Sequence, residues 1–220
     1  MSIKIVWLLA GVAMAAAAAR AEPAAPASEL ERVLERVAER FRGAPAVEGR
    51  FVQSYTNRVL GRTIEEQGTL LLAPPRRVRW AYDEPDSKLF VSAGRWAWFY
   101  VPEDGVAYRL RLDEERAQLL PSRFIAGGLR LADEFSLSEL ESSDGERRLR
   151  LDPLTPSEEF EHLELELKEG EEPELSALTV VDMLGNRTVY RFSGLKPTGP
   201  VPDELFEFVP PPGVEVVGDS

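Results

Sequence analysis

The sequence predicts a mainly β fold with a helical lid (α+β): a half-open, curled antiparallel β-barrel of about eleven strands covered by short helices. Two observations lead there. Residues 47–193 contain repeated apolar–polar alternation separated by turn-forming residues, which is typical of antiparallel strands. Helical spacing is confined to 28–43 and to a break in the strand rhythm at 114–132. Because a sheet of eleven strands must curl, we expect the helices to cover its concave side.

The first 21 residues have the layout of a cleaved secretory signal peptide. Lys4 precedes an apolar run at 5–19, and small residues end at an A-x-A site at Ala21. The run is short for a membrane span, which needs about 20 residues, although an uncleaved anchor is the alternative. We therefore expect residues 1–21 to be removed and one domain to occupy 22–220.

An amphipathic helix is predicted directly after the leader, at 28–43. Ser28 and Glu31 have the spacing of a capping box, and Gly43 is a suitable stop. The apolar residues at helical spacing are Leu30, Val33, Leu34, Val37 and Phe41. This stripe is expected to pack on a core.

The strands follow in two groups separated by the break at 114–132. Alternation and turn signals predict strands at 47–57, 63–73, 78–82, 88–92, 95–101, 106–112, 135–141, 147–151, 162–168, 175–182 and 188–193. Both faces of 95–101 are apolar, so this strand should be covered on both sides. The C-terminal stretch from 202 is expected to be a brief helical or extended piece with a proline-rich tail.

The composition argues against several classes of binding partner and membrane anchor. With 38 acidic and 26 basic residues, the formal charge is −12, which argues against a nucleic-acid partner and against lasting adhesion to an anionic bilayer. The chain has no cysteine, so it has no disulfide and is not itself anchored through a lipidated cysteine.

Chemistry-bearing motifs are scarce. His162 is the only histidine, which excludes the common zinc sites and Cys-His pairs, and no nucleophile motif accompanies it. We expect His162 to be structural or exposed, and Glu164 and Glu166 to lie on a solvated strand face. The sequence thus predicts no catalytic residue, metal or cofactor.

Aromatic residues are concentrated between 80 and 100. They are Trp80, Tyr82, Trp96, Trp98, Phe99 and Tyr100. Two interpretations remain open from the residues alone: an ordinary aromatic core, or an apolar binding pocket on the concave side of the sheet.

Four motifs in fixed order resemble those of a known family. They are "FVQSY" at 51–55, "GTLLLAPPRRVRWAY" at 68–82, "EPDSKLFVSAGRWAWFYVP" at 84–102 and "FEFVPPPGVEVV" at 206–217. With the export signal and the amphipathic helix, the chain resembles the periplasmic lipoprotein carrier family LolA over nearly all of its mature length.

The resemblance implies a soluble, monomeric periplasmic carrier without enzyme activity. Its apolar cavity would hold the acyl chains of lipoproteins, taken from an inner-membrane ABC transporter and passed to an outer-membrane receptor. The implied cavity residues are Phe51, Leu70, Leu72, Val78, Trp80, Tyr82 and Trp98, with Ile125 and Ala126 in the lid.

One position departs from the family pattern. The resemblance implies a basic residue that tethers the lid where this chain has Pro74, so Arg76 or Arg77 is the candidate replacement for the latch. A divergent relative that carries another lipid-modified protein or a free lipid also fits. The alternative function is an exported lipid- or lipoprotein-binding sensor or regulatory module on the same fold.

Overall fold

The computed structural model describes residues 28–112, 131–140 and 145–218. These residues form one twelve-stranded sheet with little helix. The strands are β1 (Ala46–Asn57), β2 (Arg62–Ala73), β3 (Arg77–Glu84), β4 (Lys88–Ala93), β5 (Trp96–Val101), β6 (Val106–Arg111), β7 (Phe135–Leu140), β8 (Glu146–Pro153), β9 (His162–Lys168), β10 (Glu174–Val181), β11 (Arg187–Thr198) and β12 (Glu215–Gly218).

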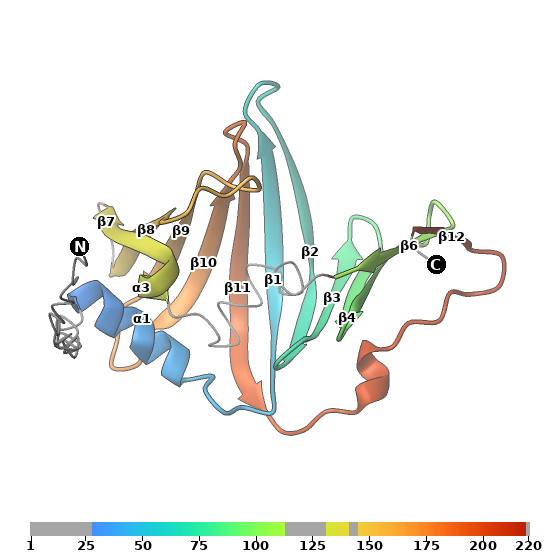
Figure 1. The fold of residues 1–220 in the computed structure, drawn as a ribbon, viewed down its shortest axis with the longest axis horizontal. Helices are drawn as coiled ribbons and strands as arrows, with labels where there is room; N and C mark the ends of the chain where they lie inside the picture. The colour runs from blue at the N-terminus through green and yellow to red at the C-terminus, as the bar shows by residue number, and fades with distance from the viewer. Residues whose placement is uncertain (1–27, 113–130, 141–144, 219–220) are drawn as a thin grey trace, which may run out of the picture.

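The sheet is built from two meanders joined at their first and last strands. Its order is β12-β6-β5-β4-β3-β2-β1-β11-β10-β9-β8-β7, so β1 and β11 meet in the middle although they are far apart in sequence. The resulting sheet is curled and open, with β12 and β7 at its edges (Figure 1). All eleven predicted strands are present, which confirms the predicted fold class.

The twelfth strand is new. β12 pairs with β6 in parallel, with Glu215 opposite Val106 and Gly218 opposite Arg109. The sequence predicted only a proline-rich tail here, because four residues are too few to show an alternation.

Helix α1 (Glu29–Glu39) begins as predicted. The Ser28 hydroxyl accepts a hydrogen bond from the Glu31 N–H at 3.2 Å, and the Glu31 carboxylate accepts one from the Ser28 N–H. Such a capping box satisfies donors that a helix start leaves unpaired. The helix lies across the half of the sheet formed by β7 to β11 (Figure 1). It buries Leu34 and Val37 against the sheet, together with Phe41, which follows the helix.

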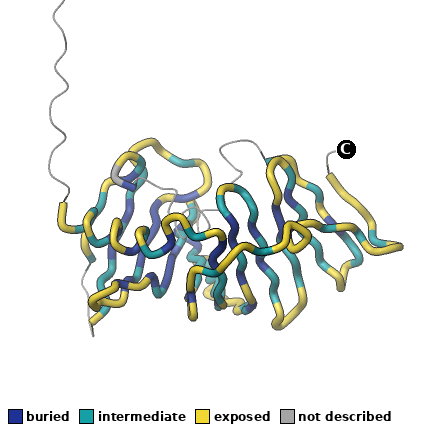
Figure 2. The backbone as a smooth tube through the Cα atoms, turned by 90° about the horizontal axis from the view of Figure 1, so that it is seen from below, coloured by how far each residue is buried: buried dark blue, intermediate teal, exposed yellow. Residues whose placement is uncertain are grey.

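The two faces of the sheet carry separate cores. We call the face that α1 covers the inner face; it holds a large cluster including Phe51, Trp80 and Leu165. The opposite, outer face holds a small cluster around Ala73 and Val91, closed by the C-terminal 3-10 helix η1 (Asp203–Phe206). Buried positions gather in the strands, while most loops are exposed (Figure 2).

The helix α3 (Leu131–Glu134) precedes β7 and adds Leu131 to the inner cluster. No helix in the described parts of the chain is long and apolar enough to cross a membrane.

Candidate functional site: the apolar inner face

An aromatic cluster occupies the middle of the inner face, where β1, β3 and β11 bring their side chains together. The Trp80 ring lies 4.5 Å from that of Phe51, 5.4 Å from Tyr190 and 6.5 Å from Phe192, between ring centroids. Tyr82 meets Phe51 edge-on at 5.0 Å. Trp80 is only 3% exposed, so the centre of this cluster is a packed core.

Strand register explains why these rings meet. Phe51 lies opposite Gly68 on β2, and Gly68 lies opposite Tyr82 on β3. Because Gly68 has no side chain, the rings of Phe51 and Tyr82 can close over it. A Cβ at Gly68 would lie 2.0 Å from the Ala81 carbonyl oxygen, so the close approach of β2 and β3 also requires glycine.

The Trp80 indole has a buried N–H group with no hydrogen-bond acceptor among the described residues. Buried donors are nearly always paired in folded proteins. The cluster therefore contains one donor whose hydrogen-bonding capacity is unused.

A polar network lies beside the rings. The Tyr82 hydroxyl donates to the Gln53 side-chain oxygen at 2.9 Å, and the Gln53 amide donates to Glu66 at 3.2 Å. Lys88 forms an ion pair with the same carboxylate. Burial raises the pKa of Tyr82, helped by Tyr190 and Glu66, and burial raises the pKa of Tyr190 to about 12, so both phenols are neutral at ordinary pH.

Sequence reasoning missed this network. Its only signal was polar residues at inward-facing positions, namely Gln53, Glu66 and Lys88, within strands that are otherwise apolar on that face.

The inner face becomes more accessible toward β6. Register aligns Trp80 with Phe90, Phe90 with Phe99, and Phe99 with Tyr108 across four strands. Tyr108 is 40% exposed and the nearby Leu110 is 46% exposed. The apolar row thus runs from a buried centre to an accessible edge.

A hollow of about 300 Å³ opens on the same face at the C-terminal end of α1. Its apolar lining comes from Phe41, Leu175, Phe192 and Leu195, and Arg40 and Lys168 lie among its polar residues. It reaches the inner core from the opposite side to Tyr108.

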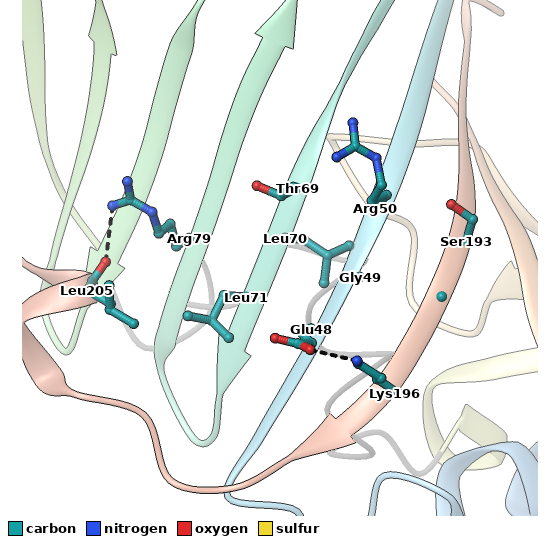
Figure 3. A pocket seen from close by; sticks show the side chains of 11 residues that line it. Glu48, Gly49, Arg50, Thr69, Leu70, Leu71, Arg79, Ser193, Lys196 and Leu205 are labelled. Atoms are coloured by element: carbon teal, nitrogen blue, oxygen red, sulfur yellow. Dashed lines mark hydrogen bonds and ion pairs between the residues drawn. The ribbon is translucent and has the colours of Figure 1, made fainter.

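The larger hollow, about 490 Å³, lies on the outer face between β1, β2, β3, β11 and Leu205 (Figure 3). Lys196 pairs with Glu48 at 3.1 Å, and Arg79 donates to the Leu205 carbonyl at 3.1 Å. A third cation, Arg50, lies 3.5 Å from Asp83. All three cations of this groove already have partners, so the inner face is the better candidate site.

Most predicted cavity residues share the inner face. They are Phe51, Leu70, Leu72, Val78, Trp80 and Tyr82. Trp98 was predicted to join them, and that placement is wrong: it lies on the outer face, packed against Phe208 at 5.4 Å. Ile125 and Ala126 fall outside the described residues. What the six inner residues bind stays a prediction.

The predicted latch residues lie near the start of β3. Arg77 forms an ion pair with Asp203, and its guanidinium lies 5.3 Å from the centre of the Phe206 ring. Arg77 thus holds η1 on the outer face. Arg76 precedes it in the turn. A role for either residue in holding a lid stays a prediction.

His162 and Glu164 form a structural network on the outer side of β9. Glu164 was predicted to be solvated, and this is wrong, because it is 7% exposed. Its carboxylate accepts from Arg187 at 2.9 and 3.1 Å and from Arg148 at 3.0 Å, with His162 Nε2 at 3.4 Å. Burial favours a high pKa for Glu164, but Arg187 and its other partners hold it below the ordinary value.

The described residues contain no group of three or more His, Asp or Glu side chains that could hold a metal ion.

Comparison with known proteins agrees with the predicted family. A family model described as "Outer membrane lipoprotein carrier protein LolA" matches residues 42–209. An outer-membrane lipoprotein carrier protein of Xanthomonas campestris pv. campestris is 33% identical over 184 residues, covering 81% of this chain and 85% of the relative. One from Bordetella pertussis is 29% identical over 206 residues, covering 94% of each chain.

The fold also has a solved counterpart. An uncharacterized conserved protein from Thermus thermophilus matches 86% of this chain and 99% of its own, with a TM-score of 0.53 and 16% identity. This likeness concerns the fold alone.

Proposed function

This chain belongs to the outer-membrane lipoprotein carrier (LolA) family, and on that premise we propose that it is a periplasmic carrier. It shields the acyl chains of lipoproteins on its apolar inner face and shuttles them from the inner to the outer membrane. The observation that carries the proposal is the continuous apolar row from Trp80 to Tyr108, buried at one end and accessible at the other.

The inner face has the chemistry that an acyl anchor needs. Hydrocarbon chains require apolar walls, which the row from Trp80 to Tyr108 supplies. The anchor's ester and amide groups require polar partners at one end, and the network of Gln53, Glu66 and Lys88 lies beside the rings. We assign the acyl chains to the row and the polar end of the anchor to the network.

Physical chemistry requires direct handover. Each methylene group gains about 0.8 kcal/mol on leaving water, so about 25 of them, as in two ordinary fatty chains, reach roughly 20 kcal/mol. Non-covalent affinity saturates at roughly 20 kcal/mol. A cargo held this tightly would be released into water too slowly to be useful. Movement between two apolar cavities costs little, and small differences between them set the direction.

The partners follow from this cycle. The cargo is an acylated lipoprotein, the donor is an inner-membrane ABC transporter, and the acceptor is an outer-membrane receptor. We propose that the carrier works as a monomer and that it performs no covalent chemistry.

The first test is native mass spectrometry of the protein purified from a periplasmic extract without detergent. Bound lipid or acylated protein is the expected result. If the protein has only its apo mass and takes up no purified lipoprotein that is added to it, the carrier proposal is contradicted.

A pair of variants tests which face of the sheet binds the cargo. Tyr108→Asp puts a charge at the accessible end of the inner row and should weaken lipoprotein uptake about tenfold or more. Val216→Asp is the matched control, because Val216 is 51% exposed and lies opposite Ala107, on the outer face. Equal uptake by both variants would place the acyl chains elsewhere.

A further inference from the structure

Two neighbouring hairpin tips carry the most exposed aliphatic residues of the central strands. The β1–β2 tip presents Val59, 81% exposed, and Leu60, 67% exposed. The β10–β11 tip presents Met183, 59% exposed, and Leu184, 72% exposed. We call residues 58–61 and 182–186 together the paired tips; they project at the same end of the sheet (Figure 1).

The paired tips are joined to each other. The Arg58 guanidinium donates to the Leu184 carbonyl at 2.9 Å, and the Arg58 N–H donates to the Asn186 side-chain oxygen at 3.0 Å. A Cβ at Gly185 would lie 2.7 Å from the Arg58 side chain, so the two tips are in contact. The four aliphatic side chains therefore form one surface held by two hairpins.

The backbone N–H groups of the first tip are hydrogen-bonded within the tip. The Asn57 side chain accepts hydrogen bonds from the N–H groups of Val59 at 3.1 Å and Leu60 at 2.9 Å. The Gly61 N–H donates to the Asn57 carbonyl at 2.9 Å. These donors therefore need no water.

The second tip repeats the arrangement. The Asp182 carboxylate accepts from the N–H groups of Leu184 at 2.8 Å and Asn186 at 2.9 Å. The Gly185 N–H donates to the Asp182 carbonyl at 2.9 Å. Exposed apolar side chains thus stand on a backbone whose donors are largely paired.

We propose that the paired tips dip into the surface layer of a phospholipid bilayer. An apolar environment penalises unpaired backbone groups, and the capping by Asn57 lowers that penalty at the first tip. The Asp182 carboxylate caps the second tip but is charged, so it has to stay at the level of the lipid headgroups. The tips are convex, which suits a bilayer surface better than a protein, whose binding would need a matching pocket. Arg58 and Arg62 are exposed beside the aliphatic residues, where lipid phosphates would lie.

The overall charge limits how much of the protein touches the bilayer. With a formal charge of −12, the protein as a whole is repelled by an anionic surface, so the contact is confined to the paired tips. This inference is independent of the acyl site, because the tips lie at the strand ends and not on the inner aromatic row.

The test is flotation of the full protein with vesicles of phosphatidylethanolamine and a minor share of phosphatidylglycerol. The double variant Leu60→Asp/Leu184→Asp should bind vesicles about tenfold less than the wild type. The matched control, Leu154→Asp/Val209→Asp, makes the same charge change at residues that are 59% and 82% exposed elsewhere, and should float like the wild type. Because all four residues are exposed, we expect both variants to keep the fold.

A second measurement reports depth. Leu60→Trp should add tryptophan emission, above that of the wild type, that lipids brominated at shallow acyl positions quench, whereas the emission added by Val209→Trp should not be quenched.

Three results would overturn the proposal: no flotation of the wild type, equal flotation of the tip and control variants, or no quenching of Leu60→Trp. If vesicle binding is unchanged while the tip variant loses cargo transfer to a purified receptor, the tips contact a protein instead. Cargo uptake measured in parallel separates failure of this inference from failure of the carrier proposal.

Discussion

Tyr190 is a partly buried phenol on the inner face, and its environment makes stability depend on alkaline pH. Burial raises its pKa to about 12, against about 10 in an unfolded chain. Between these values the folded state keeps a proton that the unfolded state has lost. The stabilisation is therefore complete below about pH 10 and is lost as the pH rises toward about 12.

We expect Tyr190→Phe to make this dependence shallower, while Tyr82 keeps its own contribution. The wild type should lose unfolding free energy more steeply than the variant between about pH 10 and 12, by urea denaturation. Tyr108→Phe, at an exposed ring, is the control and should follow the wild type. Parallel curves for the wild type and Tyr190→Phe would contradict the role of burial.

Trp80 and Trp98 illustrate what residue patterns leave undecided. Strand β5 is apolar on both faces, so alternation alone could not tell which set shares the face of Trp80. The hairpin register decides it: Ala93 pairs with Trp96, which aligns Phe90 with Phe99 and sends Trp98 to the outer face. The two-residue turn at Gly94 and Arg95 could have predicted this.

Burial changes which residues are useful probes. Trp80 is 3% exposed within the aromatic cluster, so Trp80→Glu would bury a charge and unfold the sheet before it reported on lipid binding. The accessible Tyr108 is the better position.

At the scale of elements, the contact of β2 with β3 depends on Gly68. Gly68→Ala should lower the free energy of unfolding by about 2–4 kcal/mol, because the new Cβ meets the Ala81 backbone. Gly199→Ala is the control, since a Cβ there meets no atom within 4 Å, and it should change stability by less than about 0.5 kcal/mol. Chemical denaturation measures both, and similar values would show that the strands can move apart.

The sequence predicted regular elements better than long-range ones. Helix α1 and strands β1–β11 have local signals: a capping box, alternation and turn residues. The polar network on the inner face and the ion pairs of Glu164 join residues from separate strands, so only the register reveals them. Strand β12 was not predicted, because its partner β6 lies about a hundred residues earlier in the chain.

At the scale of the whole molecule, β12 protects an edge of the sheet. A chain ending before Glu215 should leave β6 with unpaired backbone groups, which invite pairing with another copy. Sedimentation velocity should show concentration-dependent self-association of this variant and a monomer for the full chain. A monomeric variant at all concentrations would show that β6 needs no cover.

The strand order also has a consequence for biogenesis. Strands β1 to β6 are the first to leave the ribosome, yet both edges of that meander are closed by β11 and β12, the last strands to be made. Until synthesis is nearly complete, the edges of β1 and β6 stay open, and such edges template aggregation. The order in which the strands are made therefore exposes the first half of the sheet to pairing with other copies until the last strands join it.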